Sequence, residues 1–119
     1  MKKTLVLGAS TKPGRASRTA VRMLSERNME VVPVGFRAGE VNGVDIVLGR
    51  PEVEEVHTVT LYLNPKRQEE WYDYILSLAP QRIIFNPGTE NASFQQKAQS
   101  LGIETLEACT LVMLATGEY

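Results

Sequence analysis

Short apolar segments separated by turn residues recur along this chain. Five of them are continuous rather than alternating in polarity, which is typical of strands buried on both faces of a sheet. They cover residues 4–7, 30–34, 56–63, 82–85 and 103–106. Pro33 cannot donate to a strand ladder, so we place it at the carboxyl end of the second segment. A short edge element is also compatible with residues 45–48, inside a glycine-rich stretch.

Four helices are predicted between and after these strands, because apolar residues recur there at intervals of three and four. The four stripes are Ala16, Ala20, Met23 and Leu24; Trp71, Tyr74, Ile75 and Leu78; Phe94, Ala98 and Leu101; and Cys109, Val112 and Met113. Strands that alternate with helices pair in parallel through right-handed crossovers. The predicted fold is therefore α/β, a doubly wound five-stranded parallel sheet with helices on both faces. The chain length predicts one domain over residues 1–119.

Composition limits the partners and the location of the protein. Of the 119 residues, 43% are hydrophobic and 23% charged, and the net charge is −1. No broad basic field is present, so we expect neither nucleic acid nor a membrane surface as a partner. The apolar run after Lys3 is too short for a signal peptide, and no run has the length of a membrane span. With a single cysteine, Cys109, these features predict a cytoplasmic protein.

The candidate chemistry is concentrated in the loop after the first predicted strand. In a doubly wound sheet this turn receives phosphate groups, because the next helix begins there with unpaired N–H groups and a partial positive charge. Gly8 and Gly14 allow a tight turn and a close backbone approach. Hydroxyl and cationic side chains between them can donate hydrogen bonds to phosphate oxygens. The predicted cofactor contacts in this loop are Gly8, Ala9, Ser10, Lys12, Pro13, Gly14, Arg15 and Ser17.

The loop departs from the G-x-G-x-x-G pattern, since Ser10 stands where the second glycine belongs. The alternative interpretation is a turn that only caps the following helix. After the second strand, NAD-binding folds usually carry an acid that binds the ribose, whereas this chain has Gly35, Phe36 and Arg37. Arg37 suits an additional ribose phosphate, as in coenzyme A or NADP, although a solvated loop arginine explains it equally well. Phe36 either covers an adenine face or caps the sheet.

Further candidates lie at the ends of later strands. Asn64 and Asn86 follow the third and fourth predicted strands, on the same rim as the first loop. We expect each either to contact the ligand or to serve the turn in which it lies. His57 opens the third strand at the opposite edge, so it is misplaced for catalysis at that rim. Cys109 begins the last helix, where a redox role through a lowered thiol pKa competes with ordinary packing.

The motif Leu5-Val6-Leu7-Gly8-Ala9-Ser10-x-Lys12-Pro13-Gly14-Arg15-x-Ser17, read with the strand at residues 30–34, resembles the small stand-alone CoA-binding-domain proteins. These are similar to the CoA-binding domain of the succinyl-CoA synthetase α subunit. The resemblance covers the whole chain and is clear again at residues 107–109. It implies a Rossmann-like fold with strand order 3-2-1-4-5 and no established catalytic activity. It also implies CoA contacts through Ser10, Pro13, Arg15 and Ser17. The family commonly has Asn-Pro after the second strand, where this chain has Gly35-Phe36.

The preferred hypothesis is a cofactor-binding module that holds coenzyme A or an acyl-CoA and has no chemistry of its own. No metal-ligand spacing or catalytic set can be assembled on the predicted rim. The alternatives are an NADP-binding enzyme or redox sensor, and an interaction domain with a degenerate pocket. A homodimer or a partner protein is left open, with Tyr72 as a candidate contact.

Overall fold

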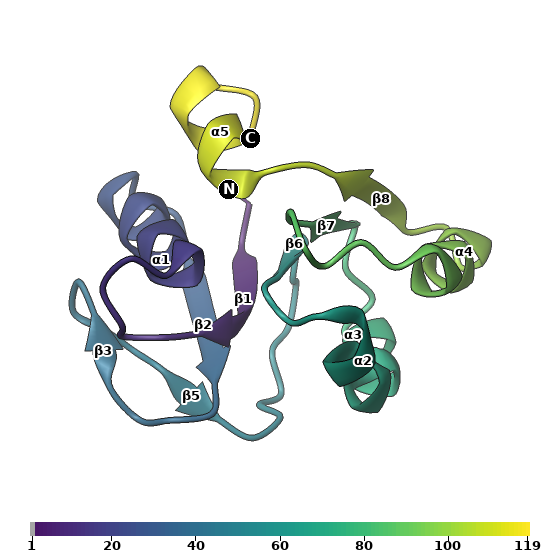
Figure 1. The fold of residues 1–119 in the computed structure, drawn as a ribbon, viewed down its shortest axis with the longest axis horizontal. Coiled ribbons are helices and arrows are strands. Elements are labelled where there is room, and N and C mark those ends of the chain that lie inside the picture. The colour runs from purple at the N-terminus through teal and green to yellow at the C-terminus, as the bar shows by residue number, and fades with distance from the viewer. Residues whose placement is uncertain (1) are drawn as a thin grey trace.

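Parallel strands form the centre of the structure, a computed structural model that describes residues 2–119. The six strands of the main sheet are β1 (Thr4–Ala9), β2 (Val31–Gly35), β5 (Val47–Leu48), β6 (Thr58–Leu61), β7 (Arg82–Phe85) and β8 (Glu104–Glu107). A separate antiparallel pair is formed by β3 (Glu40–Val41) and β4 (Val44–Asp45). The prediction of an α/β, Rossmann-like parallel sheet is confirmed (Figure 1).

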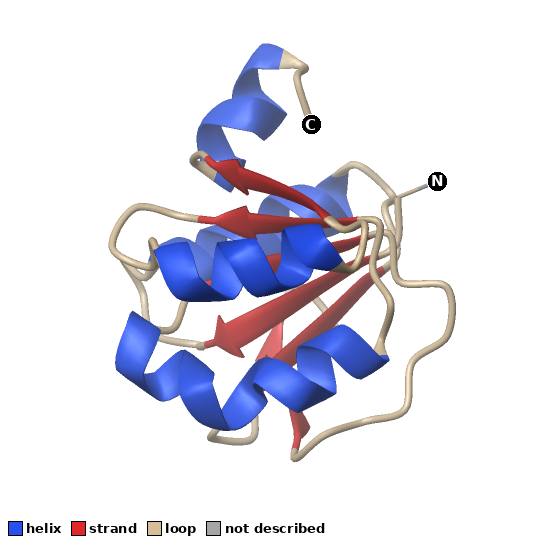
Figure 2. Cartoon of the chain, turned by 90° about the vertical axis from the view of Figure 1, so that its right-hand side faces the viewer, coloured by secondary structure: helices blue, strands red, loops and turns tan. Residues whose placement is uncertain are grey.

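Helices cover both faces of this sheet, as Figure 2 shows. They are α1 (Ala16–Glu26), α2 (Pro65–Gln68), the short 3-10 helix η1 (Glu69–Trp71), α3 (Tyr72–Ser77), α4 (Ala92–Ser100) and α5 (Thr110–Thr116). Within residues 2–119, no helix combines the length and the apolar character needed to cross a membrane.

The core divides into two layers because successive side chains of a strand point to opposite faces. Leu5 and Leu7 of β1 pack with Ile75 of α3 and Phe94 of α4. Val6, between them, belongs to the opposite cluster, which includes residues from α1 and α5. Both clusters contain fully buried side chains. This dense packing fixes the positions of the carboxyl ends of the strands relative to one another.

The strand order corrects the predicted 3-2-1-4-5 arrangement of five strands. The observed order is β5-β2-β1-β6-β7-β8, and β6, the predicted third strand, pairs with β1 rather than with β2. The short edge element supplies β5, which takes the place beside β2. The reason is burial: all four residues of β6 are buried, which suits the middle of the sheet, whereas both residues of β5 are exposed, which suits an edge.

Three predicted helix stripes each include one residue that the fold leaves exposed, namely Ala16, Leu101 and Val112. Leu101 is 62% exposed because α4 ends at Ser100, one residue earlier. Val112 is 56% exposed because α5 buries Thr110 and Leu114 instead. Such offsets at helix ends do not move the strands that carry the rim.

Candidate functional site

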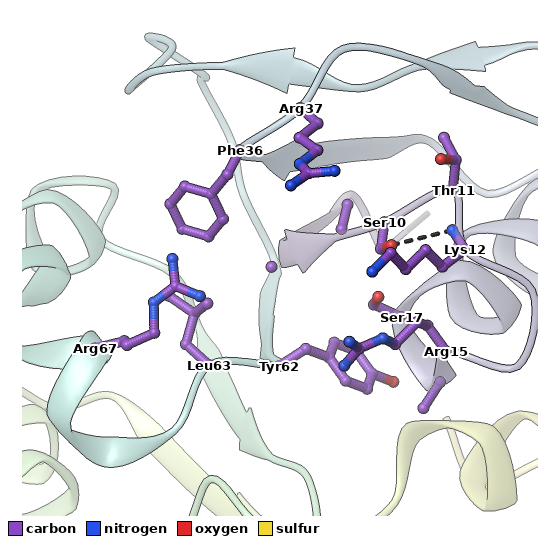
Figure 3. A pocket seen from close by; sticks show the side chains of 13 residues that line it. Ser10, Thr11, Lys12, Arg15, Ser17, Phe36, Arg37, Tyr62, Leu63 and Arg67 are labelled. Carbon is purple, nitrogen blue, oxygen red and sulfur yellow. Dashed lines mark hydrogen bonds between the residues drawn. The ribbon is translucent and has the colours of Figure 1, made fainter.

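A pocket of about 520 Å³ lies at the carboxyl ends of the central strands. The chain adds β2 and β5 on one side of β1, and then adds β6, β7 and β8 on the other side. The direction of strand addition reverses between β1 and β6, which makes this the topological switch point. Loops leaving adjacent strands diverge there, which opens a crevice. The lining residues are Gly8, Ala9, Ser10, Thr11, Lys12, Arg15, Ala16, Ser17, Phe36, Arg37, Tyr62, Leu63 and Arg67 (Figure 3).

The first loop is held in shape by its own backbone and by one close neighbour. Gly8 has a φ of +96°, and a Cβ at this position would lie 3.1 Å from the backbone of Tyr62. Both conditions favour glycine. Further along, the Lys12 N–H donates to Ser10 Oγ at 3.1 Å, and the Arg15 N–H donates to the Lys12 carbonyl at 3.2 Å. The loop therefore presents a defined surface to the pocket.

Helix α1 begins at this surface without a cap. Arg15 occupies the N-cap position with extended backbone, its side chain makes no capping hydrogen bond, and the first turn contains no acid. The first N–H groups of a helix have no partner within the helix, and the aligned peptides place a partial positive charge there. Ala16 and Ser17 of this first turn line the pocket. The arrangement suits an anion.

Positive charge is concentrated around the pocket in a chain whose net charge is −1. Four of the lining residues are cationic, and they come from the first loop, from the end of β2 and from α2. None of the lining residues is Asp or Glu. The cations are Lys12, Arg15, Arg37 and Arg67. With no acid among the lining residues to neutralise them, a polyanionic ligand would find strong attraction here.

An aromatic and cationic cluster forms one wall. Phe36 is 45% exposed, and the Arg67 guanidinium carbon lies 4.2 Å from the centroid of its ring. Trp71 borders the same cluster. Its ring plane makes an angle of 75° with the ring plane of Phe36, and the two centroids lie 6.0 Å apart. Figure 3 shows Phe36 between Arg37 and Arg67.

Eight of the predicted contacts therefore line the pocket, and the others lie elsewhere. Pro13 and Gly14 belong to the first loop but are exposed outside the lining. Gly14 has a φ of +85°, and a Cβ there would meet nothing, so its glycine serves the turn conformation. At Gly35 a Cβ would lie 2.4 Å from the Ala9 carbonyl oxygen. Gly35 thus permits the close approach of β2 to β1.

The two asparagines make hydrogen bonds within the fold, Asn64 in its own turn and Asn86 to two other elements. Asn64 caps α2 by accepting the Arg67 N–H on Oδ1 at 2.9 Å. Asn86 is buried, and its Nδ2 donates to Thr60 Oγ1 at 2.7 Å and to the Leu61 carbonyl at 2.9 Å. Asn86 Oδ1 accepts the Thr110 N–H at 2.9 Å, which ties β7 to α5. Neither side chain lines the pocket.

Five lining residues were not predicted from the sequence: Thr11, Ala16, Tyr62, Leu63 and Arg67. Thr11 and Ala16 lie within the predicted loop, and the other three enter through the position of β6 beside β1. The signal for Arg67 was the Asn64-Pro65 pair, since a helix that starts there places its first turn on the rim. Burial raises the pKa of Tyr62 to about 12, against the weaker effect of the adjacent Thr110 and Thr60 hydroxyls. Tyr62 is therefore a neutral wall of the pocket near pH 7.

His57 lies where the sequence placed it, immediately before β6 at the opposite edge of the sheet. Its backbone N–H donates to the Lys3 carbonyl at 2.9 Å, and its ring Nδ1 lies 2.7 Å from Thr58 Oγ1. Burial lowers the pKa of His57 below 6.5, and the charges of Arg82 and Lys2 lower it further, with Glu104 opposing them.

Replacing this histidine by glutamine should reduce the acid sensitivity of the fold. The unfolded chain binds a proton near the ordinary pKa and the folded chain only at a lower pH, so the free energy of unfolding falls as pH drops below about 6.5. Urea unfolding of wild type and His57→Gln at about pH 7.5 and about pH 5.5 measures the difference. His57 is the only histidine of the chain. An equal loss of stability on acidification in both proteins would contradict the assignment.

Sheet topology and the position of the pocket define a Rossmann-like α/β protein with a pocket at its switch point. A sequence model described as CoA binding domain matches residues 2–115, and the chain belongs to this CoA-binding family. The resemblance seen in the first loop is thereby confirmed.

Solved structures share this fold. The chain is similar to a crystal structure of an uncharacterized protein, with 49% identity, a TM-score of 0.96, and coverage of 100% of this chain and 98% of that one. A Thermus thermophilus structure, cell-free ID.343, has 23% identity and a TM-score of 0.85, covering 99% of this chain and 90% of that one. A hypothetical protein from Pyrococcus horikoshii OT3 has 24% identity and a TM-score of 0.85, covering 97% and 82%. The latter two support the fold alone. A search of curated proteins gave no match.

Proposed function

We propose that this protein binds coenzyme A or an acyl-CoA in the pocket at the switch point, acting as one binding domain. The observation that carries the proposal is the uncapped start of α1 at a pocket with four cationic and no acidic lining residues. Coenzyme A carries a diphosphate and a further ribose phosphate, so its charge matches this distribution. Membership of the CoA-binding family supports the same ligand.

The diphosphate belongs at the first loop in this proposal. The N–H groups at the start of α1 supply backbone donors, and Ser10 and Ser17 supply hydroxyls on the same side of the pocket. Lys12 and Arg15 add charge-assisted hydrogen bonds, which are about twice as strong as neutral ones. The adenosine end then lies beyond β2, near Phe36 and Arg37, because that is where doubly wound folds hold the ribose.

The proposal assigns no reaction to the pocket. Its lining includes no His, Cys, Asp or Glu to act as a general base or acid. Tyr62 ionises only at a pKa of about 12. Within residues 2–119, no hydrogen bond joins Ser10 or Ser17 to a basic side chain of the kind that activates a nucleophile. The role that fits is recognition of the ligand, as a sensor, a carrier or a subunit of a larger assembly.

A thermal unfolding panel tests the proposal directly. CoA and acetyl-CoA, each at about 100 times its dissociation constant, should stabilise the protein by about 2.7 kcal/mol. NAD and AMP at the same concentrations should give much smaller shifts, because each lacks the additional 2′ or 3′ ribose phosphate that cations such as Arg37 would bind. An equal or larger shift with NADP would favour the NADP-binding alternative. Indifference to all of these nucleotides would contradict the proposed function.

A further inference from the structure

The four cations of the pocket fall into two groups. Lys12 and Arg15 belong to the first loop, where the proposed diphosphate accounts for them. Arg37 and Arg67 lie on either side of Phe36, at the end of the pocket beyond β2 (Figure 3). A ligand whose only charge is a diphosphate leaves this second group without a partner. The second group therefore indicates a second phosphate, on the ribose side of the ligand.

Arg67 is held in place by a hydrogen bond of its backbone and by stacking of its guanidinium on an aromatic ring. Its backbone N–H donates to Asn64 Oδ1 at 2.9 Å, and Pro65 begins the helix with a fixed φ. The first turn of α2 is therefore anchored at the rim. Its guanidinium lies 4.2 Å from the Phe36 centroid. Stacking on an aromatic ring uses the face of a guanidinium and leaves the N–H donors at its edge available for a phosphate.

Comparison with Arg50 shows which arginine has donors to spare. Arg50 is stacked in the same way, 4.2 Å from the Trp71 ring, but its Nη2 donates to the Glu70 carbonyl at 2.8 Å. The Arg67 side chain makes no hydrogen bond and no ion pair within residues 2–119. Arg50 stabilises the fold, whereas Arg67 presents an unused, oriented fork of donors to the pocket.

We infer that Arg67, oriented by Phe36 and Asn64, is the residue that selects ligands carrying a phosphate on the adenosine ribose. The inference rests on the proposed function, since it concerns the same pocket. It assigns Arg67 a role in specificity that the first loop does not provide, because a diphosphate is common to many nucleotides. Arg37 faces the same end of the pocket and adds charge there.

Isothermal titration with CoA and 3′-dephospho-CoA tests this inference. Wild type should bind CoA about tenfold to a hundredfold more tightly than dephospho-CoA. This ratio of affinities corresponds to the free energy of one charge-assisted hydrogen bond. In Arg67→Met, which keeps the apolar stem, the ratio should fall to within about threefold, and the affinity for dephospho-CoA should not change. Lys66→Met, on the same helix but outside the pocket lining, should behave as wild type. Phe36→Leu should reduce the ratio in part, because it removes the ring that orients Arg67.

Adenosine 3′,5′-bisphosphate and adenosine 2′,5′-bisphosphate distinguish the two sources of a ribose phosphate. Stronger binding of the 3′ isomer by wild type but not by Arg67→Met supports a CoA-type ligand. A preference for the 2′ isomer that Arg67→Met also loses supports selection by Arg67 for an NADP-type ligand. If Arg67→Met keeps the ratio of the affinities for CoA and dephospho-CoA, or loses both affinities equally, the role of Arg67 is overturned but the proposed function is not. Failure of wild type to bind any of these compounds would overturn the proposed function and, with it, this inference.

Discussion

Replacing Ala16 with aspartate is expected to lower the affinity for CoA by a factor of about a hundred or more, while the fold remains at least as stable. Ala16 is exposed, lines the pocket and is the first residue of α1. A carboxylate there would face the diphosphate of the ligand, and juxtaposed like charges cost several kcal/mol. The same carboxylate would stabilise the uncapped helix start by about 0.3–1 kcal/mol, since no acid occupies the first turn.

The two opposite effects make this substitution informative. Titration calorimetry measures the affinity, and urea unfolding without ligand measures the stability. Ala16→Asn is the matched control, because asparagine has nearly the shape of aspartate and no charge. It should retain most of the affinity. Equal loss in both variants would assign the effect to side-chain volume, and retained affinity in Ala16→Asp would remove the helix start from the site.

Replacing Asn86 with alanine is expected to lower the free energy of unfolding by about 2–4 kcal/mol without changing ligand affinity in the folded protein. The side chain makes three buried hydrogen bonds, to Thr60, to Leu61 and to the backbone N–H of Thr110. Alanine would remove a hydrogen-bond partner from buried polar groups on two elements, β6 and α5, and such groups are costly when unsatisfied. The pocket lining does not include Asn86.

Urea unfolding and a CoA titration of the same variant separate the two roles considered for this residue. Asn64→Ala provides a comparison at the rim, since it removes a single capping bond worth about 1 kcal/mol. A small loss of stability with a large loss of affinity in Asn86→Ala would reverse the assignment. It would place Asn86 against the ligand instead of inside the fold.

The features that were predictable from the sequence are those encoded by neighbouring residues. The buried run before Gly8 and the helix stripe that begins at Ala16 fix a strand, a turn and a helix start within a short stretch. The chemistry of the first loop follows from that local order, because an uncapped helix start after a buried strand, next to hydroxyl and cationic side chains, favours an anion. His57 was placed at the far edge by the same local reasoning.

Features that depend on pairing between distant segments were not predictable in this way. The apolar character of residues 56–63 shows that this strand is buried but does not say beside which strand it lies. Its position next to β1 brings Tyr62, Leu63 and Arg67 to the pocket. Asn86 was ambiguous for a related reason, since its partners on β6 and α5 are known only once those elements are assembled.

All lining residues of the pocket fall between Gly8 and Arg67, although the chain continues to Tyr119. The later elements, from β7 to α5, contribute no lining residue, so we expect them to affect the ligand mainly through the fraction of molecules that is folded. Damage in that second half shifts a population, which excess ligand restores by mass action. Damage in the first loop removes contacts to the ligand, so it raises the dissociation constant of the folded molecules themselves. The two halves of this small protein thus differ in the kind of variation each tolerates.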